Sequence, residues 1–207
     1  MKKNKTIKTY NGGSWIYNSK SSNFEDADVV VMPGGGDWNP ALYGHKPNGT
    51  SYWSEKTDAT QMALIDKAVN AGKLIVGICR GGQGLTIKAG GFLIQDISHP
   101  SNHNVVTFDG RTYNMNSCHH QLCYPYELPK NQYEVLSWTE GLSNRYKADV
   151  KLEFPEFAID LKGNFKEPEV IWFPAIRGLS VQGHPEWGPG KPALDFINNL
   201  IIEKLNK

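Results

Sequence analysis

The sequence predicts an α/β fold with a mostly parallel sheet, helices on both faces and a short antiparallel extension. Two short apolar runs, 29–32 and 74–78, are typical of buried parallel strands. Between them Met62, Ile65 and Val69 recur at helical spacing and form one apolar stripe. This alternation of strand and helix is typical of a parallel sheet that helices cover on both sides.

The remaining elements are shorter and less regular. We expect the first helix to begin near Asp58, because Asp58 and Gln61 have the spacing of a capping box. A regular apolar stripe indicates a terminal helix over 192–207. No linker or repeat interrupts the chain, so residues 1–207 are expected to form one domain. The antiparallel extension is expected to contain the short apolar segments 105–108, 133–138, 157–161 and 170–173.

The composition argues against several classes of protein. The 207 residues carry a formal net charge of +1, and no block of like charge indicates a nucleic-acid or membrane surface. The basic start of the chain is not followed by an apolar region, so we expect no signal peptide. Three cysteines are too few for a disulfide framework, which favours a reducing, cytoplasmic setting. Nothing in the sequence indicates the oligomeric state.

The segment around Cys79 is the first candidate for a reactive centre. The apolar run 74–78 leads directly into Cys79, and helix-forming residues follow it. Gly77 and Gly81, two residues before and after, match the tight strand-to-helix turn that exposes a nucleophile. Amide groups at the start of the following helix would favour the thiolate. From these residues alone, an unreactive buried cysteine at the end of a core strand remains the alternative.

A thiol nucleophile needs a base, and His184 with Glu186 offers one. The two residues are two positions apart, so on an extended chain they would face the same side. A carboxylate beside an imidazole fixes its tautomer and supports the imidazolium form. Taken alone, a loop histidine beside a surface acid would explain the same pair.

Several separate motifs together resemble one known superfamily. The stretch Gly-Ile-Cys-Arg-Gly-Gly-Gln at 77–83 and Gln-Gly-His-Pro-Glu at 182–186 are similar to class I glutamine amidotransferases. The glycine loop at 33–40, the helix start at Asp58, and the segments 90–96 and 116–121 resemble its gamma-glutamyl hydrolase-like branch, the peptidase C26 group. The resemblance extends roughly over residues 28–187 and implies a flavodoxin-like arrangement of the sheet.

The resemblance also implies roles for individual residues. Cys79 would be the nucleophile, His184 the general base and acid, and Glu186 its orienting carboxylate. Backbone N–H groups of Gly35 and Arg80 would form the oxyanion hole. Substrate binding would fall to Gln83, Ser117 and His120.

The function implied is cleavage of gamma-glutamyl amide bonds through a thioester on Cys79, with no metal or organic cofactor. The substrate would be a small gamma-glutamyl compound or glutamine. One alternative is a glutaminase subunit that delivers ammonia to a separate synthetase, which would then be an obligatory partner. The other is a non-catalytic binding module on the same fold, since fold alone does not establish function.

Other candidate ligand residues are expected to be inactive. Adjacent strand residues such as His119 and His120 point to opposite faces, and the pair His99 and His103 lacks further ligands, so no metal site is expected there. Cys118 and Cys123 have no base of their own, and packing is their expected role. Two features depart from the family: the first α/β unit is short, and Gly82 is expected to widen the space beside the sulfur.

Overall fold

The computed structural model describes residues 6–98, 101–140, 143, 146–147, 166–187 and 191–207. Nine strands form one sheet, in the order β2 (Ser19–Ser21), β1 (Ile7–Tyr10), β3 (Val29–Met32), β4 (Leu74–Ile78), β13 (Gly178–Val181), β12 (Lys166–Phe173), β10 (Glu134–Glu140), β7 (Asn102–Thr107) and β8 (Thr112–Asn116). Two strand pairs lie apart from it: β5 (Phe92–Ile94) with β9 (Leu122–Tyr124), and β6 (Asp96–Ile97) with β11 (Tyr146–Lys147). The helices are α1 (Glu55–Asn70), α2 (Arg80–Lys88) and α4 (Lys191–Leu205), with 3-10 turns η1 (Pro40–Tyr43) and η2 (Pro174–Ile176).

The pairing of neighbouring strands in the large sheet changes from parallel to antiparallel at β13. Neighbouring strands from β2 to β13 are parallel, and those from β13 to β8 are antiparallel. The predicted α/β class is therefore confirmed, but the antiparallel part is as large as the parallel part and not a short extension. The expected strand at 157–161 lies outside the described residues.

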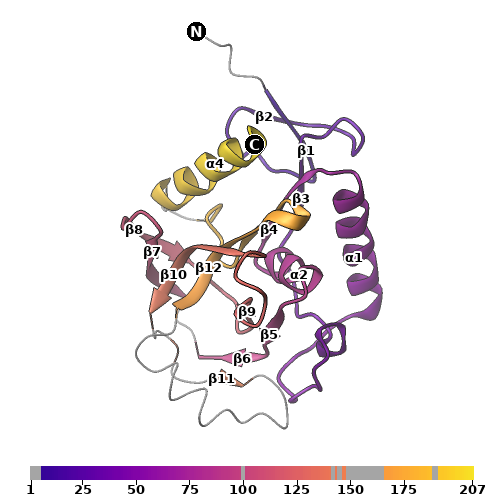
Figure 1. Ribbon diagram of the computed structural model, residues 1–207, viewed down its shortest axis with the longest axis vertical. Coiled ribbons are helices and arrows are strands. Elements are labelled where there is room, and N and C mark those ends of the chain that lie inside the picture. The colour runs from indigo at the N-terminus through magenta and orange to yellow at the C-terminus, as the bar shows by residue number, and fades with distance from the viewer. Residues whose placement is uncertain (1–5, 99–100, 141–142, 144–145, 148–165, 188–190) are drawn as a thin grey trace.

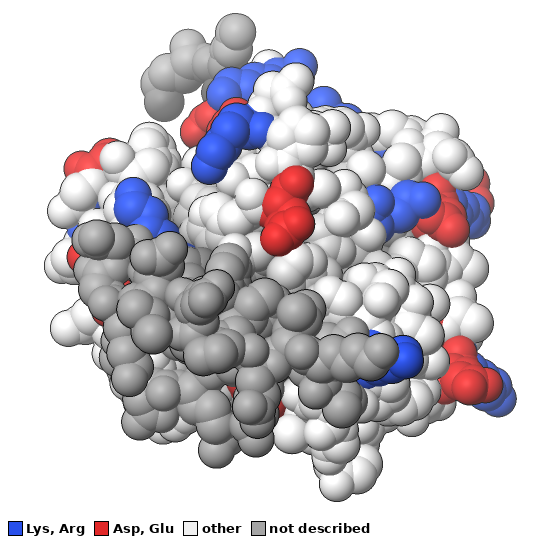
Figure 2. Space-filling model, turned by 60° about the horizontal axis from the view of Figure 1, so that its bottom comes forward, with Lys and Arg blue, Asp and Glu red and all other residues white. Residues whose placement is uncertain are grey.

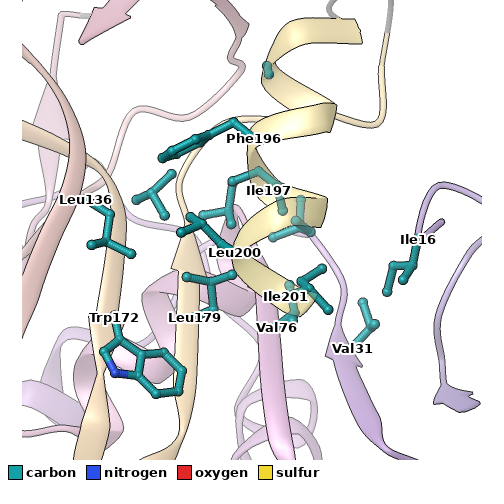
Figure 3. Packing of buried hydrophobic residues seen from close by; sticks show 14 of the residues in the cluster. Ile16, Val31, Val76, Leu136, Trp172, Leu179, Phe196, Ile197, Leu200 and Ile201 are labelled. Atoms are coloured by element: carbon teal, nitrogen blue, oxygen red, sulfur yellow. The ribbon is translucent and has the colours of Figure 1, made fainter. Parts of the chain in front are cut away.

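Helices cover both faces of the sheet, and the two faces have separate cores. In β3, Val29 and Val31 pack into one core with α4, whereas Val30 and Met32 pack into the other with α1 and α2. This follows from the strand period of two, which sends alternate side chains to opposite faces. Figure 1 shows α4 apart from α1 and α2, and Figure 3 shows α4 lying over β4 and β13.

The N-terminal unit is reduced, as expected, but its strands are present. In the described part of the chain no helix separates β1 from β3, and β1 pairs directly with both β2 and β3. The segment before β2 is held against α4 by Asn198, whose Oδ1 accepts from the Tyr17 N–H at 2.7 Å. The Asn198 Nδ2 also donates to the Trp15 carbonyl at 3.0 Å. A buried amide on α4 therefore fixes the segment that precedes β2.

The start of α1 differs from the prediction. Ser54 is the N-cap, and its side chain accepts from the Thr57 N–H at 3.4 Å. The capping-box interpretation of Asp58 and Gln61 is therefore wrong. Both side chains make contacts with Arg80, the residue that follows Cys79, instead.

The described surface carries charges of both signs. On the face shown in Figure 2, acidic and basic side chains are interspersed among neutral residues. Among the described helices, none combines the length and the apolar character needed to cross a bilayer.

Two neighbouring isoleucines on α4 test the packing of this helix on the sheet. Ile201 is fully buried and Ile202 is 43% exposed. We expect Ile201→Ala to lower the free energy of unfolding by about 2–5 kcal/mol, because it removes buried methyl groups and leaves a cavity. Ile202→Ala, the matched control, should change it by about 0.5 kcal/mol or less. Urea denaturation measures both; equal losses would contradict the placement of α4.

Candidate active site

Cys79 lies at the turn between β4 and α2. It has φ 50° and ψ −112°, a conformation that is strained for a residue with a side chain. The flanking glycines are required by close backbone approach: a Cβ at Gly77 would lie 2.4 Å from the Gly81 carbonyl, and a Cβ at Gly81 would lie 2.2 Å from the Met32 carbonyl oxygen. The turn predicted from the spacing of these glycines is present.

The Cys79 thiol is buried, and burial decides its protonation. Desolvation raises the pKa of Cys79 to about 12, and this effect outweighs the backbone N–H of Arg80, which bonds to the sulfur and lowers the pKa. The N–H at the helix start thus favours the thiolate, as expected, but burial has the larger effect on the pKa. The resting thiol is neutral near pH 7 and needs a base at the moment it reacts.

His184 and Glu186 lie in the turn that follows β13. The His184 Nδ1 is 2.7 Å from the Glu186 Oε1, and the His184 backbone N–H donates to the Asn116 carbonyl. Trp187 stacks on the imidazole, with ring centroids 3.6 Å apart and planes 6° apart. The two residues meet because the chain turns here, where Trp187 N–H bonds to the His184 carbonyl, and not because the chain is extended.

The imidazole faces the thiol. A Cβ placed at Gly34 would lie 3.6 Å from both the Cys79 Cβ and the His184 Nε2. A ligand atom of Cys79 and one of His184 lie within 4.8 Å of each other. The structure thus brings together Cys79, His184 and Glu186, with the glycine loop directly above them.

The Arg80 side chain fastens that glycine loop to the turn. Its Nη1 donates to the carbonyls of Gly36, at 2.8 Å, and Asp37. Its guanidinium lies 4.1 Å above the Trp38 ring, and the Trp38 Nε1 donates to the Arg80 carbonyl at 2.8 Å. A Cβ at Gly35 would lie 2.8 Å from the Arg80 Cδ, so the loop can lie here only without a side chain at this position.

The same guanidinium forms a buried ion pair with α1. Arg80 Nη2 is 2.6 Å from Asp58 Oδ1, and the two side chains are 2% and 5% exposed. Arg80 Nε donates to Gln61 Oε1 at 3.0 Å, and the Asn39 N–H donates to Asp58 Oδ2 at 3.1 Å. These donors and acceptors offset the cost of removing both charges from water. No local pattern in the sequence indicates this contact, because the spacing of Asp58 and Gln61 favours a capping box instead.

A cavity of about 580 Å³ opens over the thiol. Its volume lies within the range of small-molecule sites. The lining residues come from the glycine loop, the Cys79 turn, α2, the segment after β8 and the turn after β13. They are Gly34, Gly35, Gly36, Asp37, Cys79, Gln83, Cys118, His119, His120, Gln121, His184, Glu186 and Trp187.

One wall of the cavity carries His120 between two carboxylates. His120 Nε2 is 2.9 Å from Asp37 Oδ1, and its Nδ1 is 3.9 Å from Asp96 Oδ1. The hydrogen bond to Asp37 raises the pKa of His120 above its ordinary value, although burial acts in the opposite direction. Asp37 Oδ2 also accepts from the Tyr52 N–H at 2.8 Å, which fixes the carboxylate.

Of the other two expected substrate-binding residues, Gln83 lines the cavity and Ser117 does not. Gln83 lines the cavity, and its Nε2 donates to the Gln121 carbonyl at 3.1 Å. Ser117 is buried and is not among the lining residues; its backbone N–H bonds to the Ser101 carbonyl. His119 takes a place in the lining instead, with Nδ1 2.9 Å from the same Gln121 carbonyl.

Two expectations about the space near the sulfur are wrong. Gly82 faces β13, where a Cβ would lie 2.7 Å from the Ser180 Oγ, so it opens no room beside the sulfur. Cys118 is exposed at the cavity and does not pack in the core, whereas Cys123 is fully buried, as expected.

The histidines considered as metal ligands in the sequence, and rejected, have other partners where they are described. His103 Nε2 lies 2.9 Å from Glu169 Oε1 in the interior, and His99 lies outside the described residues. Within the described part of the chain, the cluster with metal-ligand spacing is Cys79, Cys118 and His184.

Comparison with known proteins shows which family the chain resembles. The family model described as Peptidase C26 matches residues 18–127. The "Putative glutamine amidotransferase-like protein YvdE" of Lactococcus lactis is 41% identical over 75 residues, which is 36% of this chain and 32% of that protein. The match thus spans about a third of the curated relative's length.

Solved structures of low sequence identity share the fold. A "putative gmp synthase subunit a protein" from Thermoplasma acidophilum has a TM-score of 0.59 at 13% identity, covering 98% of this chain and 96% of its own. A glutamine amidotransferase from Thermotoga maritima has a TM-score of 0.54 at 12% identity, covering 98% of this chain and 85% of its own. At these identities the similarity concerns the fold.

The buried ion pair gives a test of how the site is held. We expect Asp58→Ala to destabilise the protein by about 3–5 kcal/mol, because it leaves the Arg80 charge buried without its partner. Asp66 on the same helix pairs with Lys88 at 2.6 Å, but both side chains are at least one-third exposed. Asp66→Ala is therefore the control, with an expected loss of about 1 kcal/mol or less. Urea denaturation of both variants decides; a small effect of Asp58→Ala would show that Arg80 is solvated.

The protonation of His120 gives a second test. Its pKa is expected to lie above the ordinary 6.5, so the positive charge persists to higher pH than on a free histidine. Asp37→Asn should lower this pKa, because the carboxylate is its main cause. An NMR titration of the ring protons, assigned with His120→Gln, measures it. An unchanged pKa in Asp37→Asn would show that the contact is absent in solution.

Proposed function

The chain belongs to the peptidase C26 family and has the class I glutamine amidotransferase-like fold, and on this premise we propose that it hydrolyses gamma-glutamyl amide bonds. One observation carries the proposal: the Cys79 thiol, the His184 imidazole and the Glu186 carboxylate meet at the floor of one cavity. A nucleophile, a base beside it and a carboxylate that orients the base form the arrangement used for acyl transfer in catalytic triads.

The first half of the reaction forms a thioester. His184 Nε2 removes the proton from the neutral Cys79 thiol as the sulfur attacks the side-chain carbonyl carbon of the glutamyl group. The tetrahedral intermediate then collapses: the C–N bond breaks, and His184 returns the proton to the departing amine. Glu186 holds the ring by Nδ1 and stabilises the imidazolium in between.

Backbone donors stabilise the intermediate. The N–H of Arg80 lies at the start of α2 beside the sulfur, and Gly35 lines the facing wall of the cavity. Both are proposed to donate to the developing oxyanion. The Arg80 side chain keeps the two donors in fixed relation because it bonds to the carbonyls of Gly36 and Asp37.

The second half releases glutamate. A water molecule enters the space that the amine has left, and His184 removes its proton as the oxygen attacks the thioester carbon. The C–S bond breaks, the sulfur regains a proton from His184, and the acid departs. Gln83 and His120, which line the cavity, are proposed to hold the glutamyl group. These two residues are proposed for this role because the described lining contains no Lys or Arg side chain that could bind it.

A glutaminase subunit is the second candidate. The fold similarity to the protein named as a GMP synthase subunit from Thermoplasma acidophilum favours it. In that case the same thioester forms from glutamine, and the ammonia passes to a synthetase partner. Residues 1–207 would act as one domain in either case, and free thiols at the site fit a reducing cytoplasm.

Release of the amine tests the proposal. Wild type and Cys79→Ser are compared on a panel of gamma-glutamyl amides and on free glutamine. We expect wild type to cleave at least one conjugate, and Cys79→Ser to lose at least about a thousandfold in kcat, because the nucleophile is removed. Glu186→Gln should lower kcat more than it changes KM, since the carboxylate acts on the base and not on the substrate.

Cys123→Ala is the control, because it removes a buried thiol that does not line the cavity. Turnover of free glutamine alone, rising when a synthetase is added, would favour the glutaminase subunit. Equal activity in Cys79→Ser and wild type would reject both enzymatic candidates.

A further inference from the structure

Cys118 brings a second thiol to the proposed catalytic pair. One ligand atom each from Cys79, Cys118 and His184 lies within 4.8 Å of the other two. The three residues come from different parts of the chain: the turn before α2, the segment after β8 and the turn after β13. The acyl-transfer mechanism assigns no task to Cys118, although its exposed side chain lines the cavity.

We propose that Cys79, Cys118 and His184 form a binding site for a thiophilic divalent cation, of which Zn²⁺ is the best match. Two thiolates and one imidazole are a ligand set that Zn²⁺ accepts with a fourth, exchangeable position. In tetrahedral coordination such ligand atoms are about 3.6–3.8 Å apart, so the side chains need to move together by about 1 Å at most.

The orientation of His184 suits a metal as well as a thiol. Its Nδ1 is held by Glu186 at 2.7 Å, which leaves Nε2 directed to the side where Cys79 lies. A carboxylate that fixes the far nitrogen of a ligating histidine is a common second layer of zinc sites and strengthens the ligand. The cavity above the cluster leaves room for water as the fourth ligand.

Coordination would remove both reacting groups at once. Binding displaces the protons of the Cys79 and Cys118 thiols. The metal is then coordinated by the Cys79 sulfur and the His184 Nε2, so neither atom is available for the acyl transfer. The cation is therefore a reversible inhibitor and not a cofactor. Metal binding itself is independent of the hydrolase proposal, whereas the inhibition rests on that proposed function.

Cobalt and zinc titrations of the full chain, kept reduced with a phosphine, test the site. Co²⁺ is the spectroscopic probe, because thiolate ligands give it a charge-transfer absorption; Zn²⁺ is then titrated against a chromogenic chelator. We expect one ion per chain with thiolate absorption. Cys118→Ser should bind at least about 100-fold more weakly, since even indirect partners of a ligand contribute 10–100-fold. Cys123→Ala is the matched control and should bind as wild type does.

Activity is a separate readout. Where an amide substrate has been found, Zn²⁺ should inhibit wild type at concentrations at which Cys118→Ser, compared with its own metal-free rate, is unaffected. If no substrate is cleaved, the cobalt spectrum still decides the metal site. Equal affinity of Cys118→Ser and wild type would overturn the proposal, as would the absence of thiolate absorption in the reduced protein.

Discussion

The buried guanidinium of Arg80 holds the candidate site together. It follows the nucleophile directly, so the strained turn that presents Cys79 also aims this side chain at the glycine loop and at Asp58. An ion pair in the interior contributes little net stability when it is complete, but losing one partner is costly. The contact therefore acts mainly as a constraint: the glycine loop, the first turn of α1 and the proposed oxyanion donors occupy one fixed arrangement.

Burial of the thiol makes the orientation of its proposed base important. Desolvation raises the pKa of Cys79, so the proposed mechanism relies on a His184 that is already oriented when the thiol reacts. The hydrogen bond to Glu186 and the stacked Trp187 ring provide that orientation before substrate arrives. Preorganised groups of this kind act without rearrangement during the reaction, which is where much of the catalytic effect of such sites arises.

Local patterns were readable from the sequence, and long-range contacts were not. The turn at Cys79 follows from two glycines at fixed spacing, so it could be predicted. The alternation of strand and helix, which indicates helices on both faces of the sheet, could be predicted as well. The partnership of Arg80 with Asp58 joins residues 22 positions apart, and helix spacing gave a different explanation of Asp58. The exposure of Cys118 likewise depends on how the segment after β8 crosses the cavity, which no local pattern contains.

If the Cys79 sulfur carries the glutamyl group during turnover, the thioester can be trapped and identified. Wild type is mixed with a gamma-glutamyl amide, quenched in acid during turnover, and analysed by intact mass and peptide mapping. We expect an adduct of one glutamyl unit on the peptide that contains Cys79, which hydroxylamine removes because it is a thioester. Release of amine with no adduct, or with the adduct on Cys118, would contradict it.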